Sequence, residues 1–174
     1  MNDNFAIHNM TLGDIEDVTR MRLRSWLDTY VNEAAGVTRE WIEKRNERQM
    51  SPEKLAARKA WWADNPSARG WVARDEAGQV IGATTPYRDE QGVQHLGSLY
   101  VDKQWHGKGV GAALMQKVIE WSDPGQPIVL GVVAYNDRAK AFYRKWGFQE
   151  ITGSEELFDG VMPEVKMTRK GDAQ

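Results

Sequence analysis

The sequence predicts an α/β protein, an α+β arrangement with a mixed sheet, folded as one domain. Three observations lead to this fold class: helical patterns dominate residues 11–64, strand patterns dominate residues 70–102, and helices and strands alternate from residue 110 onward. At 174 residues the chain is long enough to bury a proper core, and the sequence contains no repeat or linker that would divide it. We therefore expect residues 1–170 to form a single domain, followed by a C-terminal tail at residues 171–174.

The first half begins with a short strand pattern and continues with helices. Ile15 and Val18 start an apolar stripe that recurs at helical spacing. Ser51 is expected to cap a later helix, with Pro52 at its first position. The predicted elements are a strand at 5–10 and helices at 11–31, 38–50 and 51–64.

The second half alternates strands and helices. Residues 70–89 are predicted to form two strands joined by a turn near Glu76 to Gly78. Residues 126–135 are largely apolar, which is typical of a central strand. The other predicted elements are strands at 93–102, 147–151 and 161–170, a helix from Val110 to Trp121, and a helix at 136–146 capped by Asn136.

Composition limits the classes of function. Hydrophobic residues make up 41% of the chain, charged residues make up 28%, and the formal net charge is −2. This balance gives no bulk attraction to nucleic acid or to a membrane surface. The chain has no cysteine, no signal-peptide pattern at its start and no apolar run of about 20 residues. We expect a cytoplasmic protein with no metal site.

The segment "QWHGKGVGAALMQKVIEW" places three glycines between a predicted strand and a predicted helix. Backbone N–H groups at the start of a helix lack internal partners and favour an anion, and Gly107, Gly109 and Gly111 allow a ligand to approach the backbone closely. A P-loop would need a Ser or Thr after its Gly-Lys, and a dinucleotide loop would need a different glycine spacing. Two interpretations remain from the loop alone: an anion-binding loop, or a glycine-rich turn without a ligand.

Two motifs favour the first interpretation. "LYVDKQWHGKGVGAALM" resembles the acetyl-CoA loop of the GNAT superfamily of N-acetyltransferases, Gln/Arg-x-x-Gly-x-Gly/Ala, with His106, Gly109 and Gly111 on its spacing. "NDRAKAFYRKWGF" is similar to the second motif of that superfamily. The predicted order of elements also resembles that of the superfamily across nearly the whole chain. His106 is a departure, because Gln or Arg is usual there.

The resemblance implies acetyl-CoA as co-substrate and an acetyl transfer to a primary amine. The backbone of Leu99 and Val101 would bond the pantetheine arm, the loop would hold the pyrophosphate, and Tyr143 would sit beside the sulfur as an acid. The implied cofactor-binding residues are Leu99, Tyr100, Val101, His106, Gly107, Lys108, Gly109, Val110, Gly111, Ala112, Asn136 and Tyr143. From the residues alone, Asn136 has a purely structural alternative as a helix cap and Tyr143 has one as a core residue.

The general base is the position where the chain departs most from its relatives. Many relatives carry a glutamate at the position that aligns with Gly97. His95 lies two residues earlier, and strand alternation predicts that it shares a face with Gly97, Leu99 and Val101. We therefore predict His95 as a catalytic residue, and a strand-edge histidine without a role is the alternative. Glu33 is a second candidate base.

The resemblance places the acceptor between the first two helices and the loop between the last two strands. Trp26, Tyr30 and Glu33 are the predicted acceptor-binding residues, because acidic and aromatic side chains suit a cationic amine. We predict a small cationic amine as acceptor and a protein that is a monomer or homodimer, with no nucleic-acid or membrane partner. A protein N-terminus or lysine is the alternative acceptor, and a non-catalytic acyl-CoA-binding regulatory domain is the alternative class.

Overall fold

The computed structural model describes residues 4–66 and 68–171, so the last three residues of the predicted tail lie outside the described part. Within these ranges eight strands form one sheet in the order β1-β2-β3-β4-β5-β8-β6, with β7 also paired to β8. β4 and β5 run parallel and the other neighbours run antiparallel, which confirms the predicted mixed sheet. The strands are β1 (Phe5–Asn9), β2 (Trp71–Asp75), β3 (Val80–Arg88), β4 (Gln94–Val101), β5 (Ile128–Val133), β6 (Phe148–Glu150), β7 (Glu156–Phe158) and β8 (Met162–Arg169).

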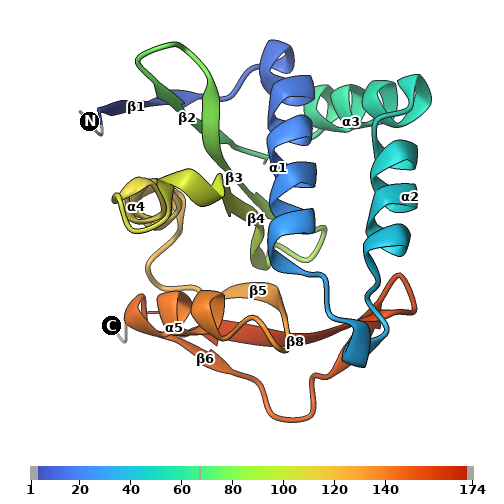
Figure 1. Ribbon diagram of the computed structural model, residues 1–174. Helices are drawn as coiled ribbons and strands as arrows, with labels where there is room; N and C mark the ends of the chain where they lie inside the picture. The colour runs from blue at the N-terminus through green and yellow to red at the C-terminus, as the bar shows by residue number, and fades with distance from the viewer. Residues whose placement is uncertain (1–3, 67, 172–174) are drawn as a thin grey trace.

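Helices cover both faces of the sheet, with α1, α2 and α3 on one side and α4 and α5 on the other (Figure 1). Strand alternation explains this division. Val72 of β2 packs with Ile15 and Met21 of α1, whereas its neighbour Ala73 packs with Val110 at the start of α4. In the described residues the α-helices are α1 (Ile15–Thr29), α2 (Arg39–Gln49), α3 (Pro52–Asp64), α4 (Val110–Trp121) and α5 (Asp137–Lys145).

The helix ends lie where the sequence predicts them. The Ser51 side chain accepts a hydrogen bond from the N–H of Lys54, and Pro52 opens α3. The Asn136 side chain accepts one from the N–H of Ala139 and so caps α5. α4 spans the predicted residues, from Val110 to Trp121. The three-residue strand β7 has no counterpart in the sequence prediction.

A bulge in β4 corrects the predicted orientation of His95. In the antiparallel ladder Thr85 pairs with Ser98 but Pro86 pairs with Leu96, so Gly97 is an extra residue in β4. The extra residue reverses the alternation, which leaves His95 on the same face as Ser98 and opposite to Leu99 and Val101. The prediction that His95 shares their face is therefore wrong.

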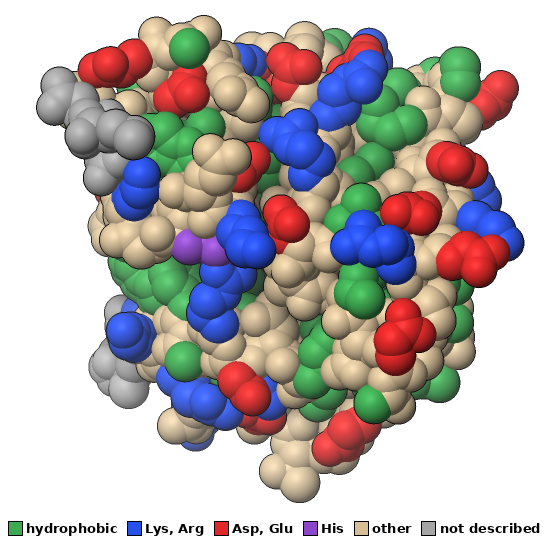
Figure 2. Space-filling model, in the orientation of Figure 1, with side chains coloured by type: hydrophobic (Ala, Val, Ile, Leu, Met, Phe, Trp, Pro, Cys, Tyr) green, Lys and Arg blue, Asp and Glu red, His purple; other side chains and the backbone are tan. Residues whose placement is uncertain are grey.

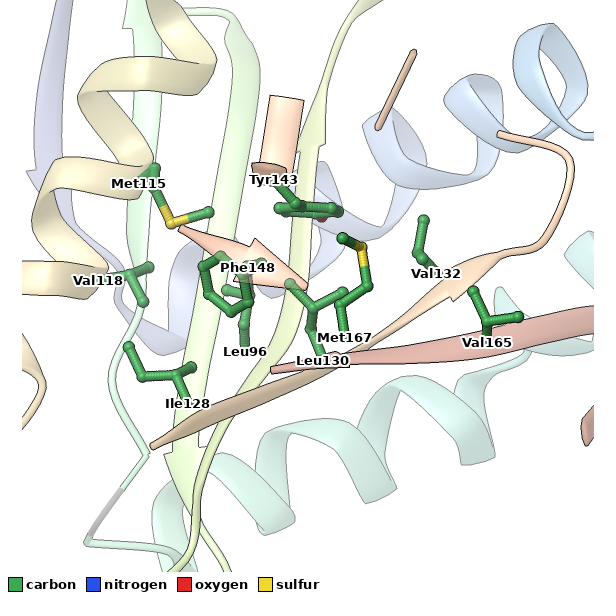
Figure 3. Close-up of a cluster of buried hydrophobic side chains, with 10 residues drawn as sticks. All are labelled: Leu96, Met115, Val118, Ile128, Leu130, Val132, Tyr143, Phe148, Val165 and Met167. Carbon is green, nitrogen blue, oxygen red and sulfur yellow. The ribbon is translucent and has the colours of Figure 1, made fainter. Parts of the chain in front are cut away.

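The core around α4, α5 and the C-terminal strands is continuous (Figure 3). Tyr143 of α5 lies over the sheet next to Phe148 and Met167, and Met115 of α4 points into the same cluster (Figure 3). The buried members of this cluster are Leu96, Met115, Val118, Ile128, Leu130, Val132, Tyr143, Phe148, Val165 and Met167. The cluster anchors both helices against the sheet beside the point where β4 and β5 separate.

Candidate active site

The sheet opens between its two parallel strands. β4 and β5 pair only at Gln94 with Ile128 and at His95 with Val129. Beyond that point β4 continues along β3, whereas β5 continues along β8. A cavity of about 1000 Å³ lies at this opening and is lined by residues of both strands and by α1, α2, α4 and α5. The cavity reaches both faces of the sheet, which is the main feature of the candidate site.

The free edge of β4 presents backbone groups to this cavity. The N–H of Asp102 donates to the C=O of Ile81, at 2.8 Å, so Asp102 turns its backbone toward β3. Because alternate residues of an antiparallel ladder face the same neighbour, Leu99 and Val101 turn theirs toward the cavity. Tyr100 turns its backbone to β3 and its side chain to the α1 face, and it lines the cavity from there.

The glycine loop lies at one end of the cavity. Gly107 (φ +77°) and Gly109 (φ +89°) adopt the left-handed conformation, and Gly109 is the N-cap of α4. The first intrahelical bond runs from the N–H of Ala113 to Gly109, so the preceding N–H groups of α4 are available to an anion. At Gly111 an added Cβ would lie 3.7 Å from its nearest neighbours, in ordinary contact. This loop can therefore bind a phosphate group through its backbone.

Two of the predicted loop residues, Lys108 and Val110, do not line the cavity. Val110 is fully buried in the core against Ile81 and Leu114. The Lys108 ammonium lies 5.1 Å from the centroid of the Trp105 ring. The predicted residues that do line the cavity are Leu99, Tyr100, Val101, His106, Gly107, Gly109, Gly111, Ala112, Asn136 and Tyr143.

His106 faces back to β4. Its Nε2–H donates to the C=O of Val101 at 2.9 Å, and Arg138 of α5 donates to its Nδ1. Desolvation and the Arg138 charge lower the pKa of His106, so the ring is neutral at pH 7. Figure 2 shows a histidine at the surface on the α4 and α5 side, with Lys and Arg side chains around it. Arg138 thus brings a positive charge next to His106 at the glycine loop.

Tyr143 and Asn136 come from α5. The Tyr143 ring is 8% exposed, packs edge-on against Phe148 and lines the cavity. Burial raises the pKa of the Tyr143 hydroxyl far above its usual value, so the group is protonated at neutral pH and can donate a hydrogen bond. Asn136 lines the cavity as well, although its Oδ1 is committed to the α5 cap.

The other end of the cavity lies beneath α1 and α2. Trp26 and Tyr30 line it as predicted, and their rings meet edge-on at 5.1 Å. The Trp26 indole N–H donates to the hydroxyl of Tyr100 at 3.0 Å. Glu33 does not line the cavity: it is exposed in a short 3₁₀ turn after α1.

His95 lines the cavity next to this end. Its ring stacks on Tyr87 at 4.9 Å between centroids, and its Nε2–H donates to the Asp89 carboxylate at 2.7 Å. The hydrogen bond from His95 lowers the pKa of Asp89, so this carboxylate is ionised. With Nε2 committed to Asp89, Nδ1 is the basic nitrogen of the neutral ring.

The atoms around Gly97 leave no room for a side chain at this position, two residues after His95. A Cβ at this position would lie 2.9 Å from the C=O of Thr85 and 3.0 Å from the Tyr87 ring. The glutamate that many relatives carry here does not fit without a shift of β3. His95 and Asp89 occupy the same neighbourhood and present a basic nitrogen.

Seven charged residues line the cavity that the sequence did not single out as site residues, although Glu156 and Glu164 fall within the C-terminal segment expected near the acceptor: Arg22, Arg45, Arg138, Lys145, Glu156, Glu164 and Lys166. Arg45 is 7% exposed although it lies in a helix whose charges were expected to be solvated. Arg45 follows Trp41 by four residues and Ile42 by three, so it lies on the buried face of α2. This spacing is the sequence signal that could have identified it. Burial and the nearby Glu156 raise the pKa of Glu164.

In residues 4–66 and 68–171, no His, Asp and Glu side chains form a cluster of three or more suited to a metal ion. No helix in the same ranges is long and apolar enough to cross a membrane.

A sheet that opens between two parallel strands, with a glycine loop and helix start at the opening, defines an acyl-CoA-binding type of fold. The chain belongs to the acetyltransferase (GNAT) family, whose sequence model matches residues 27–148. This finding confirms the family resemblance of the two motifs.

Individual relatives support the family assignment. An uncharacterised N-acetyltransferase of Mycobacterium tuberculosis is 34% identical over 98 residues, which span 54% of this chain and 61% of that protein. An L-methionine sulfoximine/L-methionine sulfone acetyltransferase of Pseudomonas aeruginosa is 31% identical over 126 residues, 66% of this chain and 67% of that protein. The PaiA N-acetyltransferase of Thermoplasma acidophilum, solved with coenzyme A, has the same fold: TM-score 0.73, 24% identity, and coverage of 96% of this chain and 99% of that one.

Proposed function

We propose that the protein is an acetyl-CoA-dependent N-acetyltransferase whose acceptor is the primary amine of a small molecule. The observation that carries this proposal is the cavity through the opened sheet. It joins an anion-binding loop on the α4 side to an aromatic and charged chamber beneath α1 and α2. Two substrates that enter from opposite faces can meet at the opening between β4 and β5.

The residues at the opening fit acetyl-CoA. The loop from Gly107 to Ala112 and the first N–H groups of α4 would hold the pyrophosphate, with Arg138 beside them. Leu99 and Val101 present backbone groups that would bond the amide-bearing pantetheine arm as a strand would. Bound acetyl-CoA supplies an activated acetyl thioester.

In the transfer, the amine nitrogen forms a bond to the thioester carbonyl carbon while the carbon–sulfur bond breaks. Starting from the ammonium form, the nitrogen loses two protons, one to the base before attack and one as the amide forms; the departing sulfur gains one, and one is released to solvent. An amine with a pKa of about 10.4 is protonated at pH 7, and its deprotonation costs about 4–5 kcal/mol. The thiol, with a pKa of about 8.5, presents a much smaller barrier. The base therefore matters more than the acid.

His95 and Tyr143 are the residues to which we assign these proton transfers. Nδ1 of His95 would accept the amine proton, directly or through water, while Asp89 stabilises the imidazolium that forms. Tyr143 would donate its hydroxyl proton to the sulfur, because burial keeps that hydroxyl protonated. The two groups line the same cavity from β4 and from α5.

The small acceptor is supported by the chamber beneath α1 and α2, whose walls are buried side chains such as Trp26 and Arg45. The Pseudomonas relative, named for amino-acid derivatives, also supports a small molecule. A protein N-terminus or lysine remains the second candidate acceptor, and a regulatory acyl-CoA-binding domain remains the alternative class.

Calorimetry with acetyl-CoA, followed by a thiol-release assay over a panel of amines, tests the proposal. We expect saturable binding and turnover of at least one small amine, with the acetylated product identified by mass spectrometry. Absence of acetyl-CoA binding would refute the proposal outright. Tight binding without turnover of any small amine or peptide would instead identify a regulatory domain.

The variant Tyr143→Phe tests the assigned acid. Loss of a general acid lowers kcat by about 10²-fold or more when chemistry limits turnover. We expect this loss with little change in the calorimetric affinity for coenzyme A, which serves as the internal control. An unchanged kcat would remove Tyr143 from the mechanism.

A further inference from the structure

Two arginines stand out among the side chains that line the acceptor chamber. Arg22 extends from α1 and Arg45 from α2, and both line the cavity beneath these helices. The Nε of Arg22 and one terminal nitrogen of Arg45, Nη1, are buried and have no hydrogen-bond partner within the described residues. A buried N–H of a charged group without a partner is costly, and native structures usually provide one. A ligand group that accepts hydrogen bonds would supply it.

The position of Arg45 is fixed before any ligand binds. Its Nε donates to the Asp159 carboxylate at 3.0 Å. The guanidinium carbon lies 3.9 Å from the centroid of the Trp26 ring and 5.1 Å from that of Phe158. Stacking and the ion pair fix the planar group where it lines the chamber, so the guanidinium is preorganised for a partner there.

Arg22 has no carboxylate partner of its own among the described residues. Its electrostatic neighbours are Tyr30, Tyr100 and Arg45, and the charge of Arg45 together with burial lowers the pKa of Arg22. The pKa of Arg58, on α3, is lowered to about 10, mainly by burial and further by the charges of Arg22 and Arg45. Positive charge therefore accumulates at this end of the cavity, where Asp159 pairs with Arg45 and Glu164 also interacts with the Arg45 charge.

We infer that the acceptor is an amino-acid-like molecule whose carboxylate binds between Arg22 and Arg45. Guanidinium groups match a carboxylate with paired N–H donors, and a buried carboxylate would offset the repulsion between the two arginines. Glu164, which lines the same cavity on β8, is placed to receive the ammonium group of such a molecule. This inference rests on the proposed acetyltransferase function.

The inference changes the acceptor predicted from the sequence. A small polycation would bring further positive charge against Arg22 and Arg45, and only Glu156 and Glu164 among the lining residues are carboxylates that could offset it. A zwitterionic acceptor satisfies all three side chains. Glu33, which suggested a cationic acceptor, lies outside the cavity.

Matched acceptor pairs test the inference directly. The wild-type enzyme is assayed with the common L-amino acids, with the amines that result from their decarboxylation, and with spermidine. We expect the favoured amino acid to exceed its decarboxylated amine by about 100-fold or more in kcat/KM, because buried donors left unpaired reject the analogue strongly. A decarboxylated amine or spermidine that is acetylated equally well would overturn the inference and leave the acetyltransferase function standing.

Variants locate the carboxylate. Arg22→Met and Arg45→Met keep an unbranched apolar stem and remove the charge. Both are expected to raise KM for the amino acid by about 30-fold or more, with unchanged affinity for coenzyme A. Arg48→Met is the matched control, since Arg48 lies exposed in the same helix as Arg45 and outside the cavity. Equal KM values in all three variants would contradict the assignment.

A binding measurement on the wild-type protein tests the inference even if the arginine variants do not fold. With coenzyme A bound, the wild-type protein is titrated with the same amino acids and amines, and the Tm is recorded. We expect at least one amino acid to raise the Tm and its decarboxylated amine to leave it unchanged. If no amino acid raises the Tm, the inference is wrong, whereas loss of coenzyme A binding would refute the proposed function instead.

Discussion

At the scale of single residues, His106 shows how neighbours decide the charge of a side chain. Its Nε2–H is held by the Val101 carbonyl, and Arg138 donates to its other nitrogen. A proton on Nδ1 would break the second contact and would place two positive charges together. Protonation of the ring is therefore disfavoured in the folded protein, and Arg138 of α5 adds a positive charge beside the loop.

This arrangement predicts a specific pH dependence of stability. The pKa of His106 lies below 6.5 in the folded state, so the unfolded chain takes up the proton first as the pH falls. Stability contributed by this group is present above about pH 6.5 and is lost below that value, until the folded pKa is passed. We expect the free energy of unfolding of the wild type to fall more steeply than that of His106→Gln between pH 7.5 and 5.5.

Chemical denaturation of both proteins at several pH values measures this difference. Other titrating groups are common to the two proteins, so the difference isolates His106. Parallel curves would mean that His106 has the same pKa folded and unfolded.

At the scale of elements, the bulge in β4 decides which side chains enter the cavity. The extra residue, Gly97, leaves His95 on one face and Leu99 with Val101 on the other. The bulge also brings the backbone of Thr85 and the ring of Tyr87 against position 97. Only a residue without a Cβ fits there.

Gly97→Ala is therefore expected to destabilise the protein. A Cβ 2.9 Å from a backbone oxygen requires β3 and β4 to move apart, and overpacking of this kind costs about 1–3 kcal/mol. For a chain of this size that corresponds to a fall in Tm of about 3–10 °C. Gly13→Ala is the control, since its Cβ would lie 3.5 Å from Thr11, in ordinary contact. Equal melting temperatures for the two variants would argue against the close approach.

Periodicity and end signals predicted most elements, because helices such as α4 and α5 carry their caps in the sequence. Short-range patterns do not predict the features that depend on pairing. β7 is three residues long and exists through its ladder with β8, and the bulge at Gly97 appears only when β4 is aligned with β3. The spacing of the glycines predicted the backbone loop of the site. Arg22 and Arg45 were missed, because their burial depends on how α1 and α2 pack over the sheet.

At the scale of the whole molecule, the sheet is continuous at one end and divided at the other. The few pairs between β4 and β5 join two halves, one built on β1 to β4 and one on β5 to β8. The cavity occupies the division, so a ligand there would complete the sheet. Binding at this place is expected to alter the exchange of specific backbone amides.

Hydrogen exchange followed by NMR tests this expectation. Without ligand, the amides of Leu99 and Val101 face the cavity and are expected to exchange quickly. Saturating coenzyme A is expected to slow both by about tenfold or more, because the pantetheine arm would take the place of a neighbouring strand. The outward-facing amides of β1, at the outer edge of the sheet, serve as the control. Equal effects at both edges would contradict a specific contact with β4.

The opening between β4 and β5 also has an evolutionary consequence. The contacts proposed there for the cofactor come from main-chain groups, which every amino acid carries, so substitutions along this edge would leave those contacts in place. The chamber beneath α1 and α2 depends instead on individual side chains, such as Arg22, Arg45 and Glu164. The cofactor half of the site can therefore be retained while the acceptor half changes. A few substitutions in two helices and one strand would then change the acceptor of a lineage.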